Sequence, residues 1–203
     1  MLLNSGEAQV EINTEGAYVD FWRVGEKDIF YPKNQLTVEG GNKKTRGGCH
    51  VCLPNFDNGD KYDLPHHGYG RLAEWRIISE SRLSVALEIN SSGSVVPDRY
   101  KQLKTRLIYV LEDEQISMLL WVKNMGKTNL ELDPAFHPYF KNDSPFYELS
   151  QTRLPITLVW SDNSDSYFCV EPTANGRSFK DGTPKVIKPG EEKSYNLTIR
   201  VFN

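Results

Sequence analysis

Three segments that lie far apart in the chain contain histidine and carboxylate side chains in settings that favour proton transfer. His66 and His67 precede a glycine in the segment HHGYGR, residues 66–71. His137 lies in DPAFHPYF, among prolines and aromatic residues, and Glu171 lies in YFCVEP, at the end of an apolar run. Burial raises the pKa of a carboxyl towards the range of a general base. An imidazole and such a carboxyl together are suited to general acid and base catalysis.

The residues alone leave structural roles open for each of these side chains. Adjacent side chains of an extended segment point in opposite directions, so we expect only one of His66 and His67 to face a pocket. The alternative for His67 is a loop ordered by ring packing and backbone hydrogen bonds. A lone histidine in the setting of His137 would more often be structural, and Glu171 could be the buried partner of an arginine.

The segment CHVC, residues 49–52, has the CxxC spacing of some zinc and redox sites. We nevertheless interpret Cys49 and Cys52 as packing residues. Residues three apart in a strand point to opposite faces, and the sequence contains no second CxxC. The neighbouring residues form strands rather than the helix N-terminus that activates a redox cysteine. We therefore predict no metal site here.

The elements that must position these residues are predicted to be strands. Residues 8–12 alternate between apolar and polar side chains, which is the period of a half-buried strand. Residues 17–24 and 27–32 are rich in aromatic and β-branched residues and predict a hairpin. Residues 103–112 and 115–124 predict a second hairpin, of two long strands.

Two further segments carry specific expectations. The second long strand, residues 115–124, has apolar residues on both faces, which predicts a central strand that is buried on both sides. Residues 33–45 are polar and contain glycine, which predicts a loop. No window of about 11 or more residues combines helical spacing of apolar residues with capping residues. The chain is therefore predicted to be all-β, as an antiparallel sandwich or barrel.

The composition limits the class of protein. A length of 203 residues, without repeats or linkers, fits one domain over residues 1–203. A net charge of -3 provides no positive field to attract nucleic acid or an anionic membrane. Three cysteines, an odd number, fit a reducing compartment. No apolar run approaches the ~18 residues of a membrane span, and no export signal is apparent. We expect a cytoplasmic protein without nucleic-acid or membrane partners.

Taken in order, the motifs RGG, HGYGR, HPYF, CVEP and KPGEE resemble those of the aldose 1-epimerases and, still more, the related hexose-6-phosphate 1-epimerases. Residues 13–32 also resemble the opening strands of this family, so the resemblance covers almost the whole chain. Each motif alone is common, but their order is specific. The resemblance implies a trimmed galactose mutarotase-like supersandwich and the interconversion of the α and β anomers of a hexose or hexose 6-phosphate.

The resemblance also implies a role for individual residues. Glu171 matches the base that removes the proton of the C1 hydroxyl, and His137 matches the acid that protonates the ring oxygen. His67 matches the histidine that hydrogen-bonds near the ring oxygen. Arg71 and Arg46 would bind sugar hydroxyls or a phosphate, for which a planar guanidinium is suited. The implied partner is a small sugar or sugar phosphate, and the reaction needs neither a metal nor another cofactor.

The chain departs from the family pattern in three places, and one of them is Gly70, which replaces a common alanine. The chain is also shorter than typical members between Phe140 and Glu171, where the family places several more strands and a substrate-binding aspartate. Asp162 and Asp165 lie in this segment, but in no matching motif, so neither is assigned that role. His50 stands where the family motif often leads to a proline.

Two other functions stay open. One is a non-catalytic carbohydrate-binding protein on the same scaffold. The other is a metal-binding β-barrel of the cupin type, with His66 or His67, His137 and Glu171 as ligands. The basic run of residues 43–46 could bind a phosphate, although short basic runs are more often solvated loops.

Overall fold

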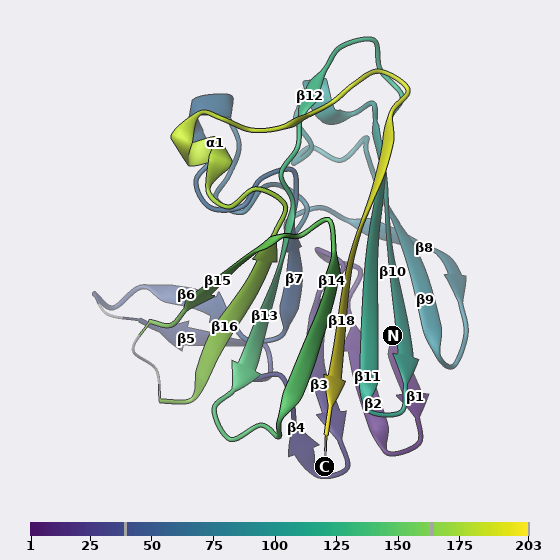
Figure 1. Ribbon diagram of the computed structural model, residues 1–203, viewed down its shortest axis with the longest axis vertical. Helices are drawn as coiled ribbons and strands as arrows, with labels where there is room; N and C mark the ends of the chain where they lie inside the picture. The colour runs from purple at the N-terminus through teal and green to yellow at the C-terminus, as the bar shows by residue number, and fades with distance from the viewer. Residues whose placement is uncertain (39, 163–164, 203) are drawn as a thin grey trace.

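The computed structural model describes residues 1–38, 40–162 and 165–202, which form two large antiparallel sheets (Figure 1). The eight-stranded sheet has the order β1-β2-β3-β7-β13-β16-β15, with β4 paired to β3. Its strands are β1 (Leu2–Ser5), β2 (Ala8–Ile12), β3 (Val19–Val24), β4 (Lys27–Asp28), β7 (Cys49–Cys52), β13 (Ala135–Lys141), β15 (Ile156–Trp160) and β16 (Tyr167–Thr173). The all-β antiparallel architecture predicted from the sequence is confirmed.

The second large sheet has six strands in the order β14-β18-β11-β10-β9-β8. These are β8 (Trp75–Glu80), β9 (Ser84–Ile89), β10 (Leu103–Glu112), β11 (Gln115–Asn124), β14 (Tyr147–Thr152) and β18 (Glu192–Val201). The smaller elements are the pairs β5 (Asn34–Thr37) with β6 (Lys43–Arg46) and β12 (Leu130–Glu131) with β17 (Val186–Ile187), the 3-10 turns Asp60–Tyr62 and Asp98–Tyr100, and the short helix α1 (Ser178–Asp181). Within the described ranges, no helix has the length and apolar character needed to cross a membrane.

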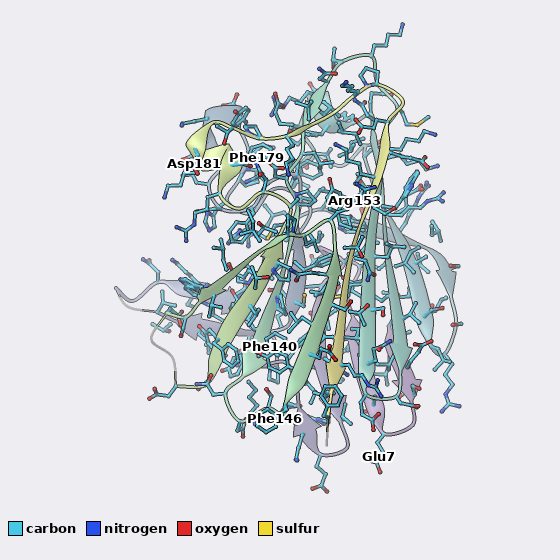
Figure 2. The ribbon with its side chains drawn as sticks, viewed as in Figure 1. Glu7, Phe140, Phe146, Arg153, Phe179 and Asp181 are labelled. Atoms are coloured by element: carbon cyan, nitrogen blue, oxygen red, sulfur yellow. The ribbon has the colours of Figure 1, made fainter. Side chains whose placement is uncertain are left out.

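The core lies between the two large sheets. Alternate residues of each strand point inwards, so Leu107, Leu120 and Leu197 of the six-stranded sheet belong to one buried cluster with Val10 and Trp22 of the other. The two sheets also meet through aromatic rings. Phe140 of β13, which Figure 2 labels, stacks on the ring of Tyr147 of β14, with centroids 4.1 Å apart and an interplanar angle of 6°.

The long hairpin predicted for residues 103–124 is confirmed, with Glu112 opposite Gln115 at its turn. β11 is a central strand, as predicted, between β10 and β18. The expectation that both of its faces are buried is wrong. One face of β11 is buried, whereas the other face is only half-buried. Among the described strands, no second sheet covers this other face. Its apolar residues are partly shielded from water by long neighbouring side chains, such as Arg106, whose guanidinium lies 5.5 Å from the ring of Trp121.

The segment 33–45 is predicted to be a loop, but within it β5 pairs with β6 (Figure 1). Most side chains of both strands are polar and at least partly exposed, so the sequence lacks the apolar alternation that announces a strand. Residue 39, in the predicted loop, lies outside the described residues. The hairpin ends at Arg46 and so brings a basic residue to the edge of the eight-stranded sheet.

Four neighbouring strands of the eight-stranded sheet, β7, β13, β16 and β15, have polar and titratable side chains on their outer face. Cys49 points inwards, with its Sγ 3.8 Å from the Sδ of Met118, whereas Cys52 packs in a separate small cluster. The interpretation of both cysteines as packing residues on opposite faces is therefore confirmed. The same alternation turns His50 of β7 and His137 of β13 to the outer face, directly opposite each other.

Candidate active site

A cavity of about 520 Å³ opens over β7, β13, β15 and β16. This volume lies within the ordinary range of small-molecule sites. The lining residues combine aromatic rings with histidines, arginines and acids: Tyr18, Lys44, Thr45, Arg46, His50, Phe56, Asp57, His66, His67, Arg71, His137, Tyr139, Leu158, Val159, Trp160, Glu171 and Arg177. All five residues predicted from the sequence, namely Arg46, His67, Arg71, His137 and Glu171, are among them.

His137 and Glu171 lie in contact at the floor of this cavity. They come from the paired strands β13 and β16, and Nε2 of His137 is 3.0 Å from Oε1 of Glu171. Their exposed fractions are only 4% and 3%. Burial raises the pKa of Glu171 from 4.5 to about 7 and lowers the pKa of His137 from 6.5 to about 3. Burial thus favours the neutral form of both groups, and between these two values the pair holds one proton.

His67 reaches the cavity from a tight turn. Its own φ is 60°, and the next residue, Gly68, has a φ of 72°. A Cβ at Gly68 would lie 2.1 Å from the carbonyl oxygen of Leu53, so only glycine fits this close approach. Nδ1 of His67 accepts the backbone N–H of Asp57 at 3.2 Å. The neutral ring therefore carries its proton on Nε2, which makes that nitrogen a hydrogen-bond donor.

The expectation that only one of His66 and His67 faces the cavity is wrong, because both line it. The left-handed backbone at His67 makes this segment a turn rather than an extended strand, so the two rings do not diverge. Their centroids are 3.9 Å apart. His66 is more exposed and lies at the rim, with Nδ1 3.6 Å from the carboxylate of Asp57.

Arg46 is held by an acid that the sequence did not assign. Nε of Arg46 donates to the carboxylate of Asp162 at 2.9 Å, and the guanidinium lies 5.1 Å from the ring of Trp160. Tyr167 also donates to Asp162, at 2.6 Å. Asp162 therefore acts on the cavity through Arg46, whereas it is not itself one of the lining residues.

Two further arginines complete a basic rim. Nε and Nη2 of Arg71 donate to the carbonyl oxygen of His66 at 3.2 and 3.1 Å. Arg177, which the sequence reading missed, forms an ion pair with Asp57 at 3.0 Å. It precedes α1, whose Ser178 donates to the buried carboxylate of Asp133 and so anchors this turn. The one feature of the sequence that could have indicated a role for Arg177 is its position shortly after Glu171.

His50 is the second residue that the sequence reading missed. Its ring is stacked between Tyr18 and His137, with centroid distances of 5.1 and 4.8 Å. The hydroxyl of Tyr18 donates to the carbonyl of Gly47 at 3.2 Å and lies 3.1 Å from Nδ1 of His50. Since the hydroxyl proton of Tyr18 is donated to Gly47, Nδ1–H of His50 is the donor in the contact between His50 and Tyr18. Nε2 is then an acceptor, without a partner among the described residues.

The charge state of His50 follows from its surroundings. Burial lowers the pKa of His50 well below its ordinary value, and the neighbouring His137 and His67 act in the same direction. Burial likewise lowers the pKa of His67. The three stacked or edge-on imidazoles are therefore uncharged at neutral pH, and the positive charge of the site comes from the arginines and Lys44.

Within the part of the chain that the structure describes, one cluster has the spacing of a metal site. A ring nitrogen of His137, Sγ of Cys169 and a carboxylate oxygen of Glu171 lie within 4.8 Å of one another, and all three residues are buried. His66 and His67, which the cupin alternative required, are not part of this cluster. The cavity therefore holds groups that are suited to proton transfer, and two of them, His137 and Glu171, form with the buried Cys169 a set of donor atoms for a cation.

The comparisons with known proteins concern the family and the fold. The model of the Aldose 1-epimerase family matches residues 1–183. The solved Slr1438 protein of Synechocystis sp. PCC 6803 has a TM-score of 0.81 at 17% identity, over 99% of this chain and 94% of that chain. A galactose mutarotase related enzyme of Lactobacillus acidophilus has a TM-score of 0.78 at 13% identity, over 100% and 97%. No curated protein is detected as a relative by sequence.

A third structure, the GalM/aldose epimerase homologue of C. elegans, has a TM-score of 0.71 at 10% identity, over 100% of this chain and 99% of that chain. At such identities the structural neighbours establish the fold alone. The family match adds to this, because it extends from the first strand through the segments that carry His67, His137 and Glu171. The chain therefore belongs to the aldose 1-epimerase family.

Proposed function

We propose that the protein is an aldose 1-epimerase that interconverts the α and β anomers of a hexose or hexose 6-phosphate. The observation that carries this proposal is the buried pair of His137 and Glu171 on the floor of a cavity of sugar size. Family membership supports the reaction class, and the geometry supports the division of labour between these two groups. Neither a metal nor another cofactor takes part in the proposed reaction.

The reaction uses one acid and one base. The carboxylate of Glu171 removes the proton of the C1 hydroxyl while the bond between C1 and the ring oxygen breaks, and His137 delivers a proton to that oxygen. The open-chain aldehyde then rotates and closes on its other face by the reverse transfers. The pair must hold one proton, on His137, when the sugar enters. In the free protein, burial places this proton mainly on Glu171. The reactive form has the same number of protons, but the proton has moved from Glu171 to His137.

Other lining residues bind the sugar in this proposal. Nε2–H of His67 donates a hydrogen bond near the ring oxygen. Trp160 and Tyr139 supply aromatic walls for the apolar face of the ring. Among the described residues, Arg46 and Arg177 form ion pairs with acids, whereas Arg71 forms none. Arg71 is therefore the arginine whose charge is most available to a phosphate.

The test is the exchange rate of sugar anomers, measured by NMR or polarimetry with the buffer rate subtracted. Glu171→Gln keeps the size of the side chain and removes the base, so we expect the rate to fall to that of the buffer. Glu148→Gln, which alters a carboxylate of β14 outside the cavity, is the matched control and is expected to keep full activity. Full activity of a folded Glu171→Gln variant would contradict the proposal.

A non-catalytic sugar-binding protein is the second candidate, and one observation favours it. In the free protein the acid and the base contact each other at 3.0 Å, so Nε2 of His137 faces Glu171 rather than a substrate. Calorimetric measurement of sugar binding, together with the rate of anomer exchange, distinguishes the two functions. Sugar binding without any acceleration of anomer exchange would favour the binding protein, whereas acceleration favours the epimerase.

A further inference from the structure

Cys169 is a buried thiol beside the acid and the base, and the proposed reaction does not use it. It lies on β16 two residues before Glu171, so both side chains point to the same face of the sheet. The exposed fraction of Cys169 is 0%. Its Sγ, a carboxylate oxygen of Glu171 and a ring nitrogen of His137 lie within 4.8 Å of one another, and Nε2 is the nitrogen of His137 that contacts Glu171. One sulfur, one nitrogen and one oxygen donor therefore converge where His137 and Glu171 line the cavity.

The spacing of these atoms is close to that of a tetrahedral metal site. Zinc lies about 2.0 to 2.3 Å from nitrogen, oxygen and sulfur ligands, which places its ligand atoms roughly 3.3 to 3.6 Å apart. The contact between His137 and Glu171 is 3.0 Å, and the widest separation in the cluster is at most 4.8 Å. Side-chain movements of roughly 1.5 Å or less would bring all three donors to a common ion.

We propose that His137, Cys169 and Glu171 bind a thiophilic divalent cation such as Zn²⁺, and that the bound ion inhibits the enzyme. The ion forms bonds to Nε2, Sγ and a carboxylate oxygen. It displaces the thiol proton and the proton that His137 and Glu171 share, and both protons leave to solvent without any redox change. Because His137 and Glu171 line the cavity, the fourth position of the ion faces the sugar site. The inhibition rests on the proposed function, whereas the binding of the ion does not.

The donor set selects the class of cation. Mg²⁺ and Ca²⁺ require six or more oxygen ligands, and in this cluster only Glu171 supplies oxygen. Sulfur and imidazole donors favour zinc and similar ions.

Two features limit the affinity. Arg46, Arg71 and Arg177 line the same cavity and repel a cation. Nδ1 of His137 has no hydrogen-bond partner among the described residues, so the ring lacks the outer support that strong sites give their ligands. Binding is therefore reversible, and a chelator removes the ion.

Binding is tested with Co²⁺ as the spectroscopic probe, after treatment of the purified protein with a chelator. The proposal expects a saturable charge-transfer band from the thiolate, at one ion per chain. Cys169→Ala removes the band and weakens binding at least about tenfold, since even the loss of an outer-shell partner costs 10- to 100-fold. Cys49→Ala is the matched control, because Cys49 is equally buried but points into the core, and it keeps the band.

Several outcomes would overturn the binding: no saturable uptake, uptake without a thiolate band, or a band that survives in Cys169→Ala. A cooperative thermal unfolding transition of each variant establishes that it is folded. Loss of the band in a folded Cys49→Ala variant would also contradict the assignment of Cys169 as the sulfur ligand.

Inhibition is tested by the anomer exchange rate in the presence of Zn²⁺. Each variant is compared with its own rate without the ion, so that a changed basal rate does not matter. We expect inhibition of the native chain that a chelator reverses, a requirement for at least about tenfold more Zn²⁺ in Cys169→Ala, and no inhibition by Mg²⁺. Equal sensitivity of the native chain and Cys169→Ala would overturn the inhibition.

The two experiments separate the two proposals. If the protein shows the thiolate band but has no epimerase activity, the proposed metal site stands and the proposed function is wrong. If the protein is an active epimerase without the band, the proposed function stands and the proposed metal site is wrong.

Discussion

The proton shared by His137 and Glu171 is the central feature at the scale of single residues. Burial moves the pKa values of the two groups apart, to about 3 and about 7, and away from their charged forms. Two coupled groups titrate as a unit, so the relevant quantity is the number of protons on the pair. The proposed chemistry needs one proton there, which can transfer to the ring oxygen, and a pair without any proton has no acid.

This argument predicts the pH dependence of kcat/KM, which reports the free enzyme. Above a pH of about 7 the pair loses its proton, so we expect kcat/KM to fall, approaching tenfold per pH unit. The measurement is anomer exchange at low substrate concentration between about pH 5 and 9, with the buffer rate subtracted. A value of kcat/KM that rises through pH 7 would show instead that Glu171 acts without a proton on His137.

His50 is expected to be an uncharged ring with its proton on Nδ1, because Tyr18 can only accept from it. NMR spectra of protein labelled with ¹⁵N in its histidines report this tautomer directly. We expect it to persist between about pH 5 and 8. Tyr18→Phe removes the acceptor and should shift His50 towards the Nε2–H form. A ring that titrates near its ordinary pKa, or that carries its proton on Nε2 in the native chain, would contradict the assignment.

At the scale of elements, the site depends on how strands and turns are joined. The register of β7 against β13 places His50 opposite His137, and the pairing of β16 with β15 places Glu171 opposite Leu158 of the cavity wall. The β5–β6 hairpin delivers Arg46 to the same cavity, and the turn at residues 66–68 delivers His67. Paired strands of the eight-stranded sheet thus carry the acid and the base, whereas Arg46 comes from a separate hairpin and His67 from a turn.

The turn can be tested at Gly68, where glycine is required both by a φ of 72° and by the carbonyl oxygen of Leu53, which would lie 2.1 Å from a Cβ. We expect Gly68→Ala to lower the free energy of unfolding by about 3 kcal/mol or more, and to raise KM by displacing His67. Gly190→Ala is the control, because Gly190 has a φ of 75° but no neighbouring atom within 4 Å.

For this control we expect a loss of about 1 kcal/mol from backbone strain alone, without any change in KM. Denaturant unfolding measures both variants. Equal losses of stability in the two would mean that the close approach to Leu53 carries no penalty.

At the scale of the whole molecule, the site has a cost in stability. The carboxyl of Glu171 has a pKa of 4.5 outside the fold and about 7 within it, so the folded protein binds its proton more tightly. The stability that this group contributes is complete below about pH 4.5 and is lost as the pH rises through about 7. The difference between these two values corresponds to about 3 kcal/mol.

We therefore expect Glu171→Gln to be more stable than the native chain at pH 8 by up to about 3 kcal/mol, and to differ little at pH 4.5. Denaturant unfolding at the two pH values measures the change, and Glu148→Gln again serves as the control. A variant that is less stable than the native chain at pH 8 would show that the ionised carboxylate is well compensated in the fold.

Much of this molecule was readable in the sequence, and the reason is local. Alternation with a period of two predicted the strands 8–12, 103–112 and 115–124, because each residue of a strand reports which face it occupies. The motifs around His67, His137 and Glu171 indicated the family for a similar reason, since each motif is a short continuous segment.

Other features were decided only by the tertiary structure. His50, Arg177 and Asp162 owe their places to strand register, to the anchoring of α1 and to an ion pair with Arg46, and each of these joins residues far apart in the chain. The burial that shifts the pKa values of His137 and Glu171 likewise depends on residues packed around them from several elements. The sequence determined the residue types and the strands that carry the chemistry, whereas folding determined their distances, their charge states and their partners, because those depend on long-range contacts.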